Sequence, residues 1–124
     1  MKAGPAKNYY ATTPEDPDPF FHPRSYRLTK KKLLEEIRAV IRSLSGWTET
    51  NYHEIQGRLQ AERRGFLFGL GESVDFYILP GQEGKVRLEM VSRSKAGKGG
   101  LNRNRKNLWE FLTRLDARWP VDSR

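Results

Sequence analysis

The sequence contains no cysteine and only two histidines, His22 and His53. The absence of cysteine excludes disulfide bonds, a zinc site with thiolate ligands and a cysteine nucleophile. The two histidines lie in different segments, with no carboxylate at the spacing of metal ligands, so a histidine-based metal site is not expected either. We predict a protein that uses no metal and no cofactor.

Motifs of common hydrolases and of nucleotide-binding proteins are missing as well. The sequence has no Gly-x-Ser-x-Gly and no dinucleotide-binding glycine pattern, and its glycine-rich stretch at 97–100 lacks the Gly-Lys-Ser/Thr ending of a P-loop. No nucleophile with a neighbouring base stands out. These absences favour a protein that is not an enzyme.

Long apolar runs are absent too. No run approaches the length of a transmembrane helix, and the N-terminus lacks the apolar core of a signal peptide. We therefore expect a cytoplasmic protein without a transmembrane segment. The length of 124 residues, with 36% hydrophobic and 31% charged residues, suits one soluble globular domain.

Negative charge is scarce in the last third of the chain. From Lys85 to Arg124 there are eleven lysines and arginines but four acidic residues, and the whole chain has a net charge of +8. A positive face of this kind attracts nucleic acid, anionic lipid headgroups or an acidic protein surface. The charge alone does not distinguish these partners.

The beginning of the chain predicts an extended leader. Residues 1–24 contain five prolines, with three acidic residues gathered at 15–18. The two phenylalanines at 20–21 are too apolar for a linker, so we expect them to dock on the domain. The single domain would then span 25–119, followed by a short tail at 120–124.

The first predicted helix begins after Thr29. Thr29 is a favoured N-cap residue type, and Leu28 and Leu33 are placed to form a hydrophobic staple across it. Apolar residues then recur at three- and four-residue spacing as far as Leu44, which indicates a helix that faces the core. We expect it to end near Gly46.

Patterns of period two follow the helix and predict an antiparallel meander. A short strand at 25–28 is a further candidate. The predicted strands run from Ile55 to Ala61, Phe66 to Leu70, Val74 to Ile78 and Val86 to Met90. A last amphipathic helix, beginning near Asn102, would bury Leu101, Leu108, Phe111, Leu112 and Leu115, with Trp119 capping the core.

This order of elements predicts a two-layer α+β domain. An antiparallel sheet of four to five strands would be covered by an N-terminal and a C-terminal helix, in the order β-α-β4-α. The arrangement is analogous to helix-grip and TATA-binding-protein-like folds. Such an analogy does not determine function.

Function is expected at the basic segment, residues 93–106, which contains six lysines and arginines and no acidic residue. Its glycines allow the backbone to approach a ligand closely, and the helix after them offers unpaired N–H groups and a positive dipole end. In the competing interpretation, Asn102 is only an N-cap and the lysines are solvated. The candidate binding residues are Ser92, Arg93, Lys95, Lys98, Gly100, Asn102, Arg103 and Arg105.

Arg93 is the foremost candidate. An arginine here can hold a carboxylate or a phosphate with two hydrogen bonds, and the outgoing helix would bring Asn102 and Arg105 back towards it. The competing interpretation, which we favour slightly, is structural: Arg93 forms a salt bridge to Glu72 or Asp75 and fixes the loop to the sheet.

Two stretches, FGLGESVDFYI and SRSKAGKGGLNRNR, resemble the signature of a bacterial and plastid family catalogued as domain of unknown function 1499. In that family a Phe-Gly-Phe turn and two aspartates precede an alternating strand. A Ser-Arg pair then leads through a glycine-containing loop to Gly-x-Asn-x-x-Arg. The resemblance covers about residues 23–115. The matching residues are Phe68, Gly69, Val74, Phe76, Ser92, Arg93, Gly100, Asn102 and Arg105.

The chain departs from the family pattern where charge is concerned. Glu72 and Ser73 stand in place of the two aspartates, and Lys98 stands in place of an aspartate in the loop. Metal or acid–base chemistry that depended on those aspartates would be lost here. The resemblance implies a fold and a candidate surface, since it brings no established activity. The family's occurrence in cyanobacteria and plastids leaves open a peripheral association with a membrane-bound complex.

Two functions follow from these observations. The first is a non-catalytic binding domain that recognises an acidic protein surface or a small anionic ligand through the basic segment. The alternative is a nucleic-acid-binding protein, in which Lys95, Lys98, Arg103 and Arg105 contact phosphates and Tyr77 stacks on bases. No RNP, KH or zinc-knuckle motif supports the alternative.

Overall fold

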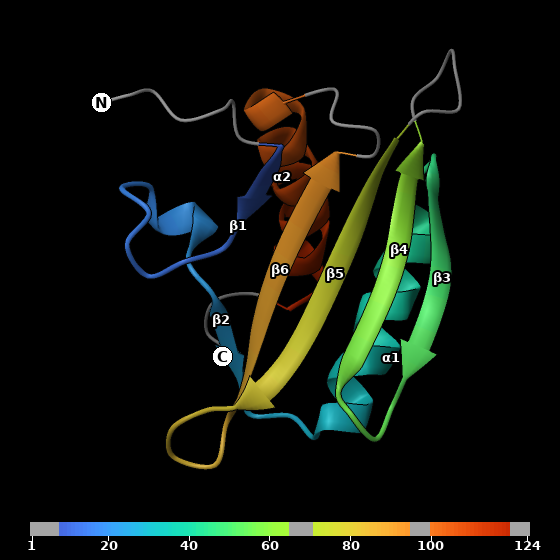
Figure 1. Ribbon diagram of the computed structural model, residues 1–124. Helices are drawn as coiled ribbons and strands as arrows, with labels where there is room; N and C mark the ends of the chain where they lie inside the picture. The colour runs from blue at the N-terminus through green and yellow to red at the C-terminus, as the bar shows by residue number, and fades with distance from the viewer. Residues whose placement is uncertain (1–7, 65–70, 95–99, 120–124) are drawn as a thin grey trace.

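The computed structural model describes residues 8–64, 71–94 and 100–119. They form a six-stranded antiparallel sheet and two long helices (Figure 1). The strand order is β1-β6-β5-β4-β3, and β2 pairs with β6 further along. The elements are β1 (Tyr9–Ala11), a 3-10 turn η1 (Pro19–Phe21), β2 (Arg24–Tyr26), α1 (Lys30–Ser43), β3 (Trp47–His53), β4 (Arg58–Arg64), β5 (Gly71–Pro80), β6 (Val86–Ser94) and α2 (Gly100–Arg118).

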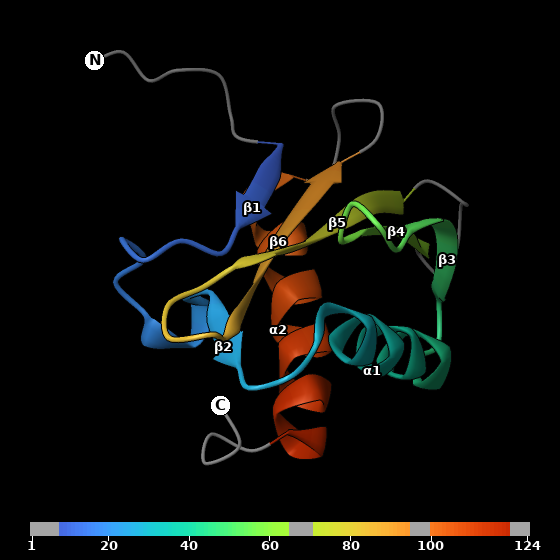
Figure 2. The same ribbon diagram turned by 90° about the horizontal axis from the view of Figure 1, so that it is seen from below.

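The two helices cover the same face of the sheet (Figure 2). α2 packs against β1 and β6, α1 packs against β3 and β5, and the helices contact each other. The α+β class and the antiparallel meander are therefore confirmed. The predicted count of four to five strands is too low, because β1 and β3 were both missed.

The hydrophobic core lies between the sheet and the helices. Alternation along β5 directs Val74, Phe76 and Ile78 into it. The ring of Phe111 on α2 lies 4.7 Å from that of Phe76 and 5.7 Å from that of Trp47, between ring centroids. This aromatic cluster joins both layers at the centre of the domain.

Helix α1 follows the prediction closely. The Oγ1 atom of Thr29 accepts a hydrogen bond of 3.0 Å from the backbone N–H of Lys32, so Thr29 is the N-cap. Its apolar stripe is buried in the core. The helix ends at Ser43, a few residues before the predicted end near Gly46.

The first part of the meander differs from the prediction. Ile55, expected to open a strand, lies in the turn between β3 and β4 and is 90% exposed. The strand that precedes this turn, β3, has the polar sequence WTETNYH and a register shift between Glu49 and Asn51. A bulged strand of mainly polar residues has no clean period of two. The predicted strand at 66–70 lies outside the described residues.

The described part of the leader belongs to the same sheet and core. Tyr9–Ala11 pairs with β6, on the N-terminal side of the predicted boundary at residue 25. Phe21 is buried and Phe20 packs against the core, as expected for the two phenylalanines. The buried guanidinium of Arg24 pairs with Asp116 near the end of α2 at 2.8 Å. The described part of the leader is therefore held by β6 at Tyr9–Ala11 and by α2 at Arg24.

Helix α2 begins at Gly100 rather than near Asn102. Four apolar side chains are buried as predicted, those of Leu108, Phe111, Leu112 and Leu115, and Trp119 packs against the core. Leu101 was expected to be buried, but 41% of its surface is exposed. The first turn of the helix therefore does not contribute to the hydrophobic core.

Glu36 of α1 holds the end of α2 in place. Its Oε1 atom accepts hydrogen bonds of 2.7 Å from Nε of Arg118 and from Nε1 of Trp119, and Lys32 pairs with its Oε2 at 3.2 Å. Burial acts to raise the pKa of Glu36, but the hydrogen bonds from Arg118, Trp119 and Lys32 outweigh it and hold the pKa below its ordinary value of 4.5. Ionised Glu36 therefore stabilises the fold.

We expect Glu36→Gln to lower the free energy of unfolding by about 1–3 kcal/mol at pH 7, because buried hydrogen bonds to a charged acceptor are weakened. A depressed folded-state pKa means that this stabilisation is present above about pH 4.5 and is lost as the pH falls through the folded-state value. The difference between wild type and variant should therefore shrink at pH 3.5. Urea unfolding at both pH values measures it.

Glu35→Gln is the matched control, because Glu35 is exposed on the same helix. Its effect should stay within about 0.5 kcal/mol. An equal loss in both variants, or a loss from Glu36→Gln that does not depend on pH, would contradict this role for Glu36.

Candidate functional site

The structure separates the predicted site residues Ser92 and Arg93. Alternation along β6 places Ser92 beneath α2, where it is fully buried, whereas Arg93 is exposed on the opposite, uncovered face. There the guanidinium of Arg93 lies 5.7 Å from the ring centroid of Tyr9. The proposed gathering of Arg93 with Asn102 and Arg105 does not occur, because α2 covers the other face of the sheet.

The alternative salt bridges of Arg93 are also not formed. Glu72 pairs with Arg103, with 3.5 Å between Oε2 and NH1. Asp75 pairs with Arg58 at 3.5 Å. The two carboxylates lie on opposite faces of β5, since they are three residues apart on a strand.

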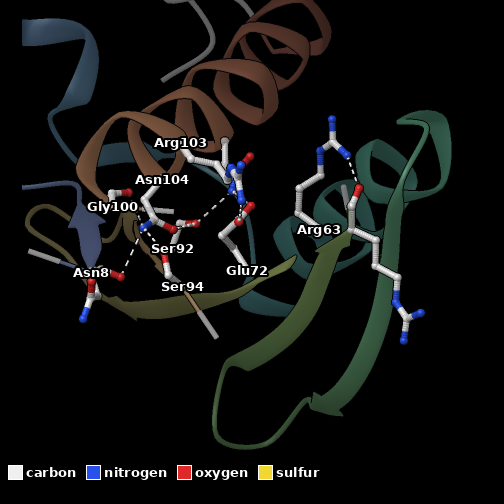
Figure 3. A network of polar contacts seen from close by, with 10 residues as sticks. Asn8, Arg63, Glu72, Ser92, Ser94, Gly100, Arg103 and Asn104 are labelled. Carbon is white, nitrogen blue, oxygen red and sulfur yellow. Dashed lines mark hydrogen bonds and ion pairs between the residues drawn. The ribbon is translucent and has the colours of Figure 1, made fainter. Parts of the chain in front are cut away.

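Four side chains form a buried polar cluster between the sheet and the first half of α2 (Figure 3). Ser92 donates from Oγ to Oδ1 of Asn104 at 2.7 Å. Asn107 donates from Nδ2 to Oγ of Ser92 at 3.1 Å and to Oε1 of Glu72 at 2.8 Å. We call Glu72, Ser92, Asn104 and Asn107 the buried polar cluster.

Asn104 extends this cluster to three segments of the chain. Its Nδ2 atom lies 3.1 Å from the carbonyl oxygen of Asn8, 2.9 Å from Oγ of Ser94 and 2.9 Å from the carbonyl oxygen of Gly100. Gly100, a predicted site residue, thus supplies an internal acceptor at the start of α2. Together with Ser92 it has a structural role in the described residues.

Three other predicted residues lie at the start of α2 or just before it. Asn102 is in the first turn of the helix and exposed, so the expectation that it is the N-cap is wrong. Lys95 and Lys98 fall outside the described residues. The predicted anion site at the helix N-terminus therefore rests on a segment that the structure does not describe.

Arg105 packs against the leader. Its guanidinium lies 4.5 Å from the ring centroid of Phe21 and 6.0 Å from that of Tyr10, and it pairs with Asp18 at 3.6 Å. The acidic residues of the leader thus meet one of the predicted binding residues within the same chain. Arg105 is half exposed but already has partners.

Arg103 faces a groove formed by α2, the segment that follows α1, the end of β4 and the start of β5. The groove has a volume of about 540 Å³. Figure 3 shows Arg103 above Glu72, with Arg63 of β4 on the other side. We call this the basic groove. It is lined by Ser45, Gly46, Arg63, Arg64, Glu72, Arg103, Lys106, Asn107, Trp109 and Glu110.

Both carboxylates of the basic groove are already bound by the protein. Asn107 and Arg103 hold Glu72. Glu110 accepts at Oε1 from Nε1 of Trp47 at 2.8 Å and from Nε of Arg63 at 3.1 Å. The cationic side chains of Arg63, Arg103 and Lys106 outnumber the two anionic ones, so the groove retains an excess of positive charge. The side chain of Arg64 lies on the opposite face of β4.

Lys106 contributes most directly to that excess. Within the described ranges 8–64, 71–94 and 100–119 it makes no ion pair or side-chain hydrogen bond, and it is exposed. Arg64 is 62% exposed at its side chain, and its Nε pairs with Glu62 at 3.1 Å. A lysine without a partner beside arginines is a ready binding point for an anion.

Sequence reasoning missed Arg63, Arg64 and Trp109. The two arginines come from β4, about 40 residues before α2, and no sequence pattern relates them to the helix. Trp109 did give a signal, since it stands next to the apolar stripe of α2 on its polar side. It is 53% exposed.

The described part of the chain contains no group of three or more histidine, cysteine, aspartate or glutamate side chains that could hold a metal ion. Neither α1 nor α2 is long and apolar enough to cross a membrane.

Comparison with known proteins gives one family. The model of the family described as "Protein of unknown function (DUF1499)" matches residues 3–115. No curated protein matches the chain.

We expect Asn104→Ala to lower the free energy of unfolding by about 2 kcal/mol, because it removes the acceptor of the buried Ser92 hydroxyl and the donor to three partly buried oxygens on Ser94, Gly100 and Asn8. Asn102→Ala, the same substitution in the same turn, should change it by less than about 0.5 kcal/mol because that side chain is exposed. Urea unfolding compares the two. Equal effects would show that the buried polar cluster does not hold α2.

Proposed function

Because the chain belongs to the DUF1499 family, whose description gives no activity, we propose a function from its own geometry. The protein is a non-catalytic binding domain that recognises an anionic group, on an acidic protein surface or on a small ligand. Residues Arg103 and Lys106 of the basic segment provide the contact, together with Arg63 of β4. The recognition site is the basic groove.

The observation that carries this proposal is the state of the charges in the groove. Each of its two carboxylates is engaged by the protein, whereas Lys106 has no partner among the described residues. Entry of a carboxylate or phosphate would therefore break no existing pair of Lys106. Arg63 is held by Glu110, so part of the site is already oriented before a ligand arrives.

The other candidate binding residues that the structure describes make different contacts. Ser92 and Gly100 belong to the buried hydrogen-bond network, Arg105 packs on the leader, and Arg93 points to the uncovered face. The proposal therefore narrows the predicted surface to the side of α2 that carries Arg103 and Lys106.

Nucleic-acid binding is the second candidate, favoured by the uncovered face of the sheet. There Arg93 lies over Tyr9 and Arg58 lies 5.5 Å from the ring centroid of Tyr77. A sheet with one uncovered face also fits the helix-grip or TATA-binding-protein-like arrangement that we propose for the fold. That analogy does not determine function. Three carboxylates on the same face, Glu62, Asp75 and Glu89, pair with its arginines and weaken the case.

A cytoplasmic location forms part of the proposal, as does peripheral association with a membrane-bound complex through an acidic partner. The peripheral association is supported by the excess of positive charge around the basic groove.

We expect Lys106→Glu to weaken binding of a fluorescent polyglutamate peptide about tenfold or more at low salt, since a direct contact worth about 1.4 kcal/mol or more is replaced by repulsion. Fluorescence anisotropy measures the affinity. Circular dichroism confirms that the variant is folded, as expected for an exposed position.

Lys31→Glu is the matched control, because it makes the same change in net charge at an exposed position on α1. It should alter the affinity less than about twofold at moderate salt. Equal losses in the two variants would show attraction by net charge alone and contradict a defined site. Oligonucleotide binding that survives Lys106→Glu and is lost in Tyr9→Ala would favour the second candidate.

A further inference from the structure

Trp109 is the one tryptophan of three whose indole has no carboxylate partner among the described residues. Nε1 of Trp47 donates to Glu110, and Nε1 of Trp119 donates to Glu36. Trp109 instead lines the basic groove and is 53% exposed. A large aromatic surface left open beside cations offers a flat wall to a ligand.

The basic groove is larger than an anion alone requires. Its volume of about 540 Å³ falls within the range of roughly 300–1,000 Å³ that is typical of sites for small organic molecules. A bare carboxylate or phosphate would leave most of it to water. The ligand therefore has a body in addition to its charged group.

The charges limit the groove to one anionic group of a ligand at a time. Glu72 and Glu110 lie in the lining between the cations. Like charges held close together raise the energy of a complex. A single carboxylate can reach Lys106 and Arg103 while the uncharged body of the ligand passes over the rest, whereas a second anionic group inside the groove would lie close to the glutamates. A polyglutamate peptide meets this limit when one of its side chains enters the groove.

The spacing along α2 sets the shape of the ligand. Arg103, Lys106 and Trp109 follow one another at intervals of three residues, so they lie along one side of the helix. One interval corresponds to a rise of about 4.5 Å. This is close to the distance from a carboxylate to the far side of the aromatic ring that bears it.

The wall opposite α2 is flat and fixed. The guanidinium of Arg63 is held by Glu110 and by the carbonyl oxygen of Arg64, and it packs over Gly46. A Cβ atom on Gly46 would lie 2.5 Å from NH1 of Arg63, and the φ of +86° at this position favours glycine. A planar guanidinium in a fixed position stacks well on a flat ligand.

We propose that the basic groove binds a small aromatic monocarboxylate. The carboxylate pairs with Lys106 and Arg103, and the ring lies between the indole of Trp109 and the guanidinium of Arg63. This inference rests on the proposed anion-binding function and adds the chemical class of the ligand.

The test uses the full chain and three probes that differ in one property each. 2-Naphthoate has both the ring and the charge, acetate has only the charge, and 2-naphthylmethanol has only the ring. Isothermal titration calorimetry gives the affinities. We expect 2-naphthoate to bind at least tenfold more tightly than either of the other two, and to shift the indole N–H resonance of Trp109 in nitrogen-15 NMR spectra, identified with Trp109→Phe.

Two variants separate ring recognition from charge recognition. Trp109→Ala should weaken 2-naphthoate binding at least tenfold and leave polyglutamate binding within about twofold, and Trp109→Phe should restore most of the loss. Lys106→Gln should weaken the binding of both 2-naphthoate and polyglutamate. Trp109 is exposed, so these variants are expected to fold, and circular dichroism verifies it.

Several results would overturn the inference. If acetate binds as tightly as 2-naphthoate, or if Trp109→Ala leaves 2-naphthoate binding unchanged, ring recognition is refuted while the anion-binding function stands. If neither 2-naphthoate nor polyglutamate binds to wild type, both proposals fail. Equal binding of 2-naphthylmethanol and 2-naphthoate would leave an apolar site without a role for Lys106 and refute the inference as well.

Discussion

The buried polar cluster fixes how α2 lies on the sheet. Apolar contacts of Leu108, Phe111 and Leu115 hold the helix on the sheet, but such contacts are not directional. Hydrogen bonds from Asn104 and Asn107 allow one rotation and one axial position, because each needs a partner at a set distance and angle. A polar cluster that is fully bonded in the core gives this specificity at some expense in stability.

The geometry of the basic groove depends on the buried polar cluster, because the cluster positions α2. The groove residues of α2 alternate in sequence with the two buried asparagines; they are Arg103, Lys106 and Trp109. The hydrogen bonds of the asparagines fix the rotation of α2 and thereby direct these three side chains towards the groove. Glu72 belongs to both, since one oxygen accepts from Asn107 and the other pairs with Arg103. A substitution of Glu72 would therefore change both the packing of α2 and the candidate binding site.

Strong local patterns were sufficient to predict α1, β5, β6 and the core of α2. The N-cap at Thr29 and the alternation from Val74 to Ile78 are encoded within a few residues. The polar strand β3 and the groove are not encoded in that way. Arg63 and Lys106 are brought together by the pairing of distant segments, and Asn104 and Asn107 look like solvent-exposed residues until the helix is placed. The basic segment formed a cluster in the sequence, yet the alternation of β6 divided it between two faces.

The polar sequence that made β3 hard to recognise has a consequence for solubility. Among the described residues β3 pairs only with β4, so it is a free edge of the sheet. An open edge can add a strand from another molecule and start aggregation. The bulge between Glu49 and Asn51 interrupts the regular row of backbone groups that such pairing needs, and Glu49 is tied back to Arg38 of α1 at 2.8 Å. The irregular strand thus protects a concentrated solution of this protein against edge-to-edge association.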